Sequence, residues 1–173
     1  VIGTGYLGAT HAACMASLGF EVIGVDIDAA KVATLSRGEI PFYEPGLDTL
    51  LAEQVQSGRL TFSNSFDDIA DCDIHFICVG TPQVRDGLAA DLTYVDASLD
   101  ALARIAKNGS LIVGKSTVPV GTATRLRERL LSINPEVDLA WNPEFLREGF
   151  AVEDTLRPNR LVVGHPAFLD VPW

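Results

Sequence analysis

Short apolar runs alternate with longer segments of helical periodicity along most of the chain. Brief runs rich in Val, Ile and Leu predict strands, and apolar residues spaced three and four apart predict helices. On this basis strands are expected at 1–2, 21–25, 60–62, 74–79, 110–113, 137–141 and 160–163. Helices are expected at 7–18, 28–37, 45–58, 95–106 and 122–131.

Strands that alternate with helices predict an α/β fold with a doubly wound, mostly parallel sheet. The uninterrupted apolar run at 74–79 is typical of a central strand that is covered on both faces. Right-handed crossovers bring the carboxyl ends of parallel strands to one edge, where ligands bind. The candidate functional residues are therefore those that directly follow the strands.

A glycine-rich segment, G-T-G-Y-L-G at 3–8, follows the first predicted strand and opens a helix. Gly3 allows a tight turn, Gly5 allows backbone to approach a diphosphate, and Gly8 allows close packing of helix against strand. Asp26 ends the next strand, 18 residues after Gly8, near the spacing of about 20 expected for a dinucleotide fingerprint. The segment therefore predicts a Rossmann-type dinucleotide-binding domain.

The acidic residue indicates which cofactor binds. A carboxylate at Asp26 would accept hydrogen bonds from ribose hydroxyls and repel a 2′-phosphate, which favours NAD over NADP. Lys31, one turn into the following helix, could reach the same ribose. The alternatives are that Asp26 only caps the helix and that Lys31 is a solvated surface lysine.

Two of the later strands are also followed by polar residues. Thr81 and Pro82 come after the run at 74–79, and a threonine there could bind the nicotinamide half of the cofactor, although a plain turn is the simpler interpretation. Ser116 and Thr117 follow the strand at 110–113. Thr117 could orient a water or a substrate hydroxyl, whereas capping of the next helix is the alternative role of both hydroxyls.

Two glutamates follow the strand at 137–141. Glu144 and Glu148 are four residues apart, so they would share a face if the segment were helical. Carboxylates at the ligand edge of the sheet could transfer protons. The alternative is a solvated surface segment.

Composition excludes several classes of function. The 173 residues carry 23 acidic against 13 basic side chains, a net charge of −10, which argues against nucleic acid as a partner. No apolar run approaches the roughly 20 residues of a membrane span, and no signal peptide is visible, so a cytoplasmic protein without a membrane partner is expected. Cys14, Cys72 and Cys78 lack metal-ligand spacing. No metal site is predicted, and Cys14 and Cys78 are interpreted as core residues in a reducing compartment.

Taken together and in order, six segments resemble the UDP-glucose/GDP-mannose dehydrogenase family. They are GTGYLG at 3–8, VDIDAAKV at 25–32, IPFYEPG at 40–46, VGTP at 79–82, KSTVPVGT at 115–122 and NPEFLREG at 142–149. The resemblance covers nearly the whole chain. It implies a Rossmann-type NAD-binding domain and a two-step oxidation of a sugar C6 alcohol to a carboxylate, with two molecules of NAD consumed.

The resemblance also implies roles for individual residues. Thr117 matches a threonine that helps to hold the catalytic water, Glu144 a glutamate with acid/base work near the substrate, and Glu148 a glutamate that contacts cofactor and substrate. The implied cofactor contacts are Gly3, Gly5, Tyr6, Leu7, Gly8, Asp26, Lys31, Thr81, Pro82, Ser116, Thr117 and Glu148. The implied substrate contacts are Glu144, Phe145, Leu146, Arg147 and Glu148.

The chain departs from the family pattern in what it lacks. The family's nucleophilic cysteine stands in a G-G-x-C segment, and none of the three cysteines has that context. We therefore expect residues 1–164 to form the NAD-binding domain with a truncated first strand, 165–173 to be an unassigned tail, and the central helix and UDP-binding domain to be absent. Such a fragment would be inactive alone, and its parent protein a homodimer or higher oligomer.

Three hypotheses on the function follow. The resemblance favours UDP-glucose as the nucleotide-sugar partner, oxidised to UDP-glucuronate. GDP-mannose is the alternative within the family. A non-catalytic NAD-binding module is the alternative outside enzymes.

Overall fold

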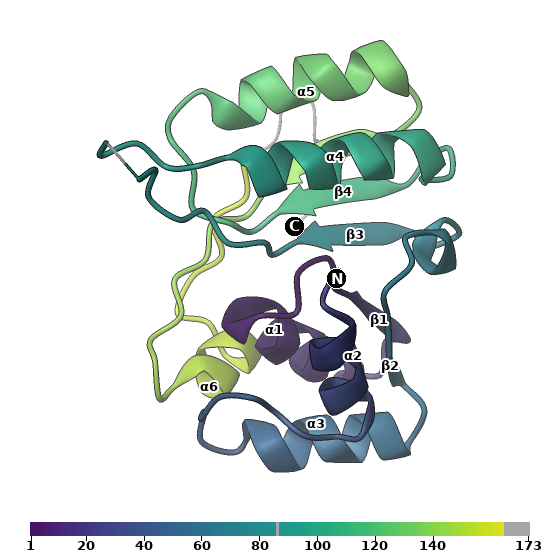
Figure 1. Cartoon of the computed structure of the whole chain (residues 1–173), viewed down its shortest axis with the longest axis vertical. Coiled ribbons are helices and arrows are strands. Elements are labelled where there is room, and N and C mark those ends of the chain that lie inside the picture. Colours follow the sequence, from purple (N-terminus) through teal and green to yellow (C-terminus); the bar gives the residue numbers. More distant parts are fainter. Residues whose placement is uncertain (86, 165–173) are drawn as a thin grey trace.

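The computed structural model describes residues 1–85 and 87–164, which form a parallel sheet between two layers of helices (Figure 1). The strands are β1 (Val22–Val25), β2 (Leu60–Ser63), β3 (Ile74–Ile77), β4 (Leu111–Gly114) and β5 (Asp138–Trp141). The helices are α1 (Tyr6–Ser17), α2 (Ala29–Ser36), α3 (Leu47–Gln56), α4 (Thr93–Ile105), α5 (Thr122–Ile133) and α6 (Ala151–Leu156), with a 3₁₀ turn at Asp67–Ile69. Within these described residues, no helix is both long and apolar enough to cross a membrane.

The opening residues join two groups of strands. β1 pairs with β2, and β3, β4 and β5 pair in that order, all in parallel register. Ile2 bridges Val25 on one side and Ile77 on the other, also in parallel. The order across the sheet is therefore β2, β1, the segment at Ile2, β3, β4, β5, which confirms the predicted doubly wound α/β fold. The chain reverses its direction of winding at Ile2, where such sheets bind ligands.

Each face of the sheet has its own hydrophobic core, because successive strand residues point to opposite faces. Val22 packs with Ala9, Leu51 and other residues of α1 and α3. Val25, three residues along the same strand, packs in a core formed with α4 and α5. The predicted burial of Cys14 and Cys78 is confirmed.

Local sequence explains where α2 begins. The Asp28 carboxylate accepts hydrogen bonds from the N–H groups of Ala30 and Lys31, at 3.0 and 3.1 Å, and so caps the helix. The start predicted for α3 was early. Pro45 lies before the helix, which begins at Leu47 after Gly46 has adopted a φ of 76°.

In the last third of the chain one prediction is wrong, one condition is not met and one helix was not predicted. The strand expected at 160–163 is wrong, since its residues form no strand and only Gly164 makes an antiparallel bridge, to Trp141. The segment at 142–149 is not helical, so no helical face is shared by Glu144 and Glu148. Helix α6, which has six residues, was not predicted because it is too short for a clear period. The tail expected at 165–173 lies outside the described residues.

Candidate functional site

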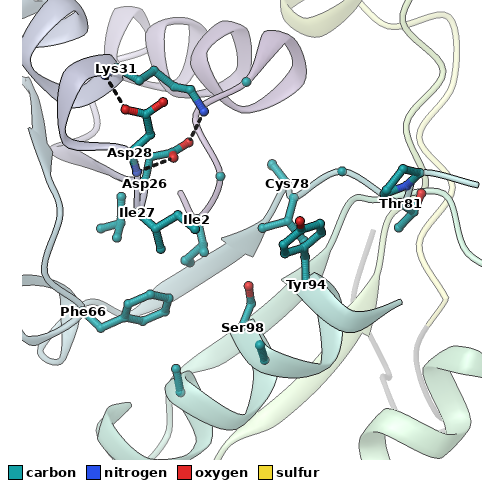
Figure 2. Close-up of a pocket in the computed structure, with 18 residues that line it drawn as sticks. Ile2, Asp26, Ile27, Asp28, Lys31, Phe66, Cys78, Thr81, Tyr94 and Ser98 are labelled. Atoms are coloured by element: carbon teal, nitrogen blue, oxygen red, sulfur yellow. Dashed lines mark hydrogen bonds and ion pairs between the residues drawn. The ribbon is translucent and has the colours of Figure 1, made fainter. Parts of the chain in front are cut away.

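A cleft of about 870 Å³ opens at the carboxyl ends of β1 and β3 (Figure 2). Its walls come from the glycine loop, from the residues that follow the two strands, and from one face of α4. Five of its lining residues, Gly5, Cys78, Val79, Gly80 and Thr81, also line a second cavity of about 260 Å³. The two cavities therefore adjoin across the start of α1.

The three glycines of the opening loop do different work. Gly3 has a φ of 84°, which side chains other than glycine rarely adopt. A Cβ atom on Gly8 would lie 1.8 Å from the carbonyl oxygen of Gly3, so this helix packs against the loop only with glycine. A Cβ atom on Gly5 would meet nothing within 4 Å. The space at Gly5 is therefore open to a ligand.

The first turn of α1 can bind an anion. Gly5 stands at the N-cap, no side chain caps the helix, and the first turn holds no acidic residue. The first N–H groups of a helix have no partner within it, and the helix dipole favours negative charge there. Together with the open space at Gly5, these groups fit the diphosphate of a dinucleotide.

Asp26 directly follows β1, and its carboxylate faces the cleft (Figure 2). Its Oδ2 atom accepts from the N–H of Thr4 at 2.9 Å, the hydroxyl of Thr4 at 3.1 Å and Nζ of Lys31 at 2.9 Å. Its Oδ1 atom accepts from the N–H of Asp28 at 3.0 Å. Burial alone would raise the pKa of Asp26, but these donors outweigh it and hold the pKa below its usual value. The group is thus a carboxylate at neutral pH.

Lys31 is neither a solvated lysine nor a free donor. Its ammonium pairs with Asp26, and its side chain is 30% exposed against 8% for the aspartate. Oδ2 of Asp26 already accepts from three donors, whereas Oδ1 accepts from one. A hydroxyl of a ligand can therefore donate to Oδ1, and at Oδ2 it would share the oxygen with Lys31. The pair therefore presents both an acceptor and a donor at the same end of the cleft.

One wall of the cleft is formed by residues that were not predicted from the sequence. Tyr94, Ala97, Ser98 and Ala101 of α4 line it, and Phe66 lies opposite β1 (Figure 2). The spacing of the α4 residues, i, i+3, i+4 and i+7, was the available signal, because it gives one helix face of mostly small side chains. With Phe66 this wall offers a flat, largely apolar slot.

The smaller cavity gathers candidates from three distant segments. Tyr6, Ser116, Thr117 and Glu144 all line it. The Glu144 carboxylate accepts a hydrogen bond from the N–H of Leu146, which keeps it beside its own loop. An acid and a hydroxyl therefore lie next to the helix start that fits a diphosphate.

Hydroxyl groups tie the strand ends together. Ser116 donates to the carbonyl of Val79 at 2.6 Å, and Thr81 donates to the carbonyl of Thr117 at 2.9 Å. Both hydroxyls thus use their proton within the protein and keep only acceptor capacity toward a ligand. Pro82 follows in the wall of the larger cavity.

The structure does not bring every predicted residue to the cavities. Neither cavity is lined by Phe145, Leu146, Arg147 or Glu148; Leu146 is half-buried and the other three are exposed. The Arg147 guanidinium instead forms an ion pair with Asp154 of α6 at 2.7 Å. The 145–148 segment therefore faces outward from the cleft.

Two charged side chains near the smaller cavity had no predicted role. Lys115 is half-buried, and its Nζ donates to Oδ1 of Asn142 at 3.0 Å, while burial lowers its pKa. Glu44 is buried and bonds to Tyr6. Both stand in segments that carried the family resemblance, KSTVPVGT and IPFYEPG, but sequence alone did not reveal what they contact.

Comparison with known proteins decides the family. Residues 1–167 match the model of the UDP-glucose/GDP-mannose dehydrogenase family, NAD binding domain. This chain belongs to that family. It is an NAD-binding domain of nucleotide-sugar dehydrogenases, as the motifs predicted. The open loop at Gly5, the uncapped start of α1 and the carboxylate of Asp26 fit NAD.

Individual relatives agree. UDP-glucose 6-dehydrogenase from Pseudomonas aeruginosa is 46% identical over 171 residues, which cover 95% of this chain and 38% of that protein. A UDP-glucose dehydrogenase structure from Pyrobaculum islandicum superposes with a TM-score of 0.86 at 42% identity, over 95% of this chain and 39% of that one. A GDP-mannose dehydrogenase from Pseudomonas aeruginosa gives 0.89 at 34% identity, over 95% and 40%. The chain thus spans well under half the length of these relatives.

Proposed function

We propose that this chain is the cofactor-binding part of an enzyme that oxidises the C6 hydroxyl of UDP-glucose to the carboxylate of UDP-glucuronate. The observation that carries the proposal is the pair of adjoining cavities, which run from Asp26 past Gly5 to Thr117 and Glu144. The similarity to UDP-glucose 6-dehydrogenase at 46% identity supports this substrate.

Each end of the cleft has a distinct task in this proposal. Asp26 and Lys31 hold the adenosine ribose, and the N–H groups at the start of α1 hold the diphosphate. Bound NAD supplies a hydride acceptor for each of the two oxidation steps. The slot between Phe66 and the α4 face accepts a flat aromatic base, because its side chains are mostly small or apolar.

At the other end, chain residues move protons and orient water. Glu144 accepts the proton that leaves the C6 hydroxyl, releases it to solvent, and as a carboxylate again later activates water as a general base. Thr117, which lines the same cavity, orients that water through its hydroxyl. We further propose that Phe145, Leu146, Arg147 and Glu148 contact the nucleotide sugar, from the exposed side of the segment.

We propose that none of Cys14, Cys72 and Cys78 supplies the nucleophilic thiol, because none stands in the G-G-x-C context of the family. Cys78 lines both cavities, but burial raises the pKa of its thiol to about 12, so it is not a thiolate at neutral pH. Burial raises the pKa of Cys14 to about 12 as well. Residues 1–173 alone are therefore expected to bind NAD without oxidising UDP-glucose.

The first experiment is calorimetry of the 173-residue chain with NAD and with NADP, followed by an absorbance assay at 340 nm with UDP-glucose. We expect binding of NAD, weaker binding of NADP and no turnover. Equal affinity for the two cofactors would contradict the role of Asp26, and sustained turnover would contradict the account of the missing thiol.

The second experiment concerns the full-length protein. Glu144→Gln should lower kcat by roughly 100-fold, the scale of general acid/base catalysis, and leave the NAD dissociation constant within about twofold. Assays with UDP-glucose and GDP-mannose in parallel decide the substrate. Faster turnover of GDP-mannose would overturn the proposed substrate, and wild-type turnover of Glu144→Gln would overturn the proposed base.

A further inference from the structure

Glu44 is a buried carboxylate without an ion-pair partner among the described residues. Its side chain is 2% exposed, and it lies in the loop between α2 and α3. A buried charge is costly unless hydrogen bonds or an opposite charge compensate it. The local loop does not supply that compensation, so its donors must come from elsewhere in the chain.

The donors come from two distant segments. The hydroxyl of Tyr6, in the first turn of α1, donates to Oε2 of Glu44. The N–H of Gly149 donates to the same oxygen at 2.9 Å, and the N–H of Ala151 donates to Oε1 at 2.8 Å. One carboxylate thus joins the glycine loop to the end of the 142–149 segment and to the start of α6, which lies beside α1 (Figure 1).

These donors stabilise the charged form of Glu44. Burial would raise the pKa of Glu44, but hydrogen bonds from Tyr6 and from the N–H groups of Gly149 and Ala151 hold the pKa below its usual value. The negative charge also stands at the N-terminal end of α6, where the free N–H groups favour it. Burial and the bond to Glu44 raise the pKa of Tyr6 to about 12. The Tyr6 hydroxyl is therefore a fixed donor to a permanent carboxylate.

Two of the three partners of Glu44, Tyr6 and Gly149, belong to segments that border the candidate catalytic region. Tyr6 lines the smaller cavity together with Thr117 and Glu144, and its ring packs on Phe42 with centroids 5.3 Å apart. Gly149 ends the segment that begins just before Glu144 and adopts a φ of 85°. A shift at Glu44 would therefore move a wall of the cavity and the loop that carries the acid at the same time.

We infer that Glu44 is a positioning residue that sets the placement of Glu144 relative to the bound cofactor. This inference rests on the proposed function, because it assumes that Glu144 acts on a substrate there. Glu44 itself lines neither cavity. It acts through Tyr6 and Gly149, and Gly149 lies 105 residues from Glu44 in the sequence.

Glu44→Gln is the sharpest variant, because it keeps the shape and removes the charge. Three donors converge on two acceptor oxygens, and a glutamine amide turns one of those acceptors into a donor. Whichever way the amide points, at least one buried N–H or O–H group loses its partner and the linkage opens. Tyr6→Phe, which removes one donor and keeps the ring, is the second variant. Glu53→Gln, on the exposed side of α3, is the matched control.

In the full-length protein we expect Glu44→Gln to lower kcat by roughly 10- to 100-fold, the cost of misplacing a catalytic group by about an ångström. The NAD dissociation constant should change by less than about twofold, because Asp26 and Gly5 are untouched. Glu53→Gln should match the wild type. Tyr6→Phe should lower kcat in the same direction. Wild-type kcat in both Glu44→Gln and Tyr6→Phe would overturn the inference.

A spectroscopic measurement on the 173-residue chain keeps the two proposals separate. Tyrosine titration at 295 nm should find one group near pH 12 in the wild type and bring it closer to 10 in Glu44→Gln. An unchanged titration would overturn the inference whatever the enzyme assays give. If the wild-type full-length protein failed to oxidise UDP-glucose, the proposed function would fail. The positioning role of Glu44 would still be tested by the tyrosine titration and by the turnover of GDP-mannose in the same variants.

Discussion

The glycine loop with Asp26 and the 142–149 segment with Glu144 contribute to two adjoining cavities, but they are held in opposite ways. Asp26 is 8% exposed and accepts four hydrogen bonds, all from residues within 22 positions of it. Glu144 stands in a segment without helix or strand, and its carboxylate accepts a single bond, from Leu146. The end of that segment is held by Glu44, 105 residues away.

This difference separates binding from chemistry. The cofactor end is built from backbone geometry, since a positive φ at Gly3, close packing at Gly8 and an uncapped helix start all follow from one short stretch. The acid end relies on side-chain contacts over long sequence distances. We therefore expect changes in the loop to affect stability and NAD affinity, and changes around 142–149 to affect turnover.

The largest effect should come from Gly8→Ala. Its Cβ would overlap the carbonyl of Gly3 at 1.8 Å, so the loop and helix must move apart, at a cost of about 3 kcal/mol in the free energy of unfolding. Gly5→Ala is the matched control, because a Cβ there has open space. It should leave stability within about 0.5 kcal/mol, yet lower NAD affinity by roughly tenfold by blocking the diphosphate. Chemical denaturation and calorimetry measure both, and equal stability of the two variants would contradict the packing argument.

A pH effect tests how firmly the α1 layer is buried. His11 of α1 packs edge-on against Phe76, with the ring centroids 4.3 Å apart. Neither ring nitrogen of His11 has a hydrogen-bond partner among the described residues. Burial, and to a lesser degree the charge of Lys115, lower its pKa to about 3. The unfolded chain binds a proton below about pH 6.5, where the folded chain still does not. The contribution of the neutral His11 to the free energy of unfolding is therefore fully present above pH 6.5 and is lost as the pH falls toward 3.

The expected slope is about 1.4 kcal/mol per pH unit for this histidine, or roughly 2–3 kcal/mol between pH 6.5 and 4.5. His11→Leu should remove that share of the dependence. His75 is also buried with a pKa lowered to about 4, so part of the slope should persist. Denaturation at a series of pH values checks this, and identical slopes in wild type and His11→Leu would show that the ring is solvated.

Asp26→Asn should come next in size, on affinity instead of stability. A hydrogen bond to a charged acceptor contributes about 1.5–3 kcal/mol, so NAD affinity should fall between roughly tenfold and a hundredfold. The preference for NAD over NADP should shrink, because less charge opposes a 2′-phosphate. Asp28→Asn is the control, since asparagine also caps helices well. Equal losses in the two variants would remove the special role of Asp26.

The smallest effect should come from the outward side of the acid segment. Arg147 is 63% exposed where it pairs with Asp154, and such pairs contribute little. Arg147→Gln should shift the melting temperature by no more than about 2 °C. In the full-length protein it should raise the KM for UDP-glucose, if Arg147 contacts substrate as proposed. A large loss of stability with unchanged KM would instead make the arginine purely structural.

Periodicity predicted the five strands and five of the six helices, because each long element carries its own apolar pattern. The strand expected at 160–163 was wrong for an identifiable reason. Leu161, Val162 and Val163 are apolar but remain 72%, 43% and 58% exposed in the described structure, so their composition did not reflect burial in the sheet. Helix α6 was not predicted because its six residues are too few for a clear period, and its contact with Glu44 leaves no local signal.

The candidate residues divide in the same way. Those after the strands could be assigned to one edge, since parallel topology alone brings such positions together, and Thr117 and Glu144 do line one cavity. The outward direction of Phe145 through Glu148 could not be predicted, because it depends on a loop without regular structure. The α4 wall and the Lys115–Asn142 contact likewise needed three-dimensional packing.

By itself the sequence determined the fold class, the family and the place of the dinucleotide loop, since these follow from local patterns that need no distant partner. Only the tertiary structure decided that Lys31 pairs with Asp26, that Glu144 stands in an irregular loop, and that Glu44 joins this loop to α1. The physical reason is that a buried charge is stabilised by whichever donors the fold delivers to it. Those donors are set by packing and not by spacing along the chain.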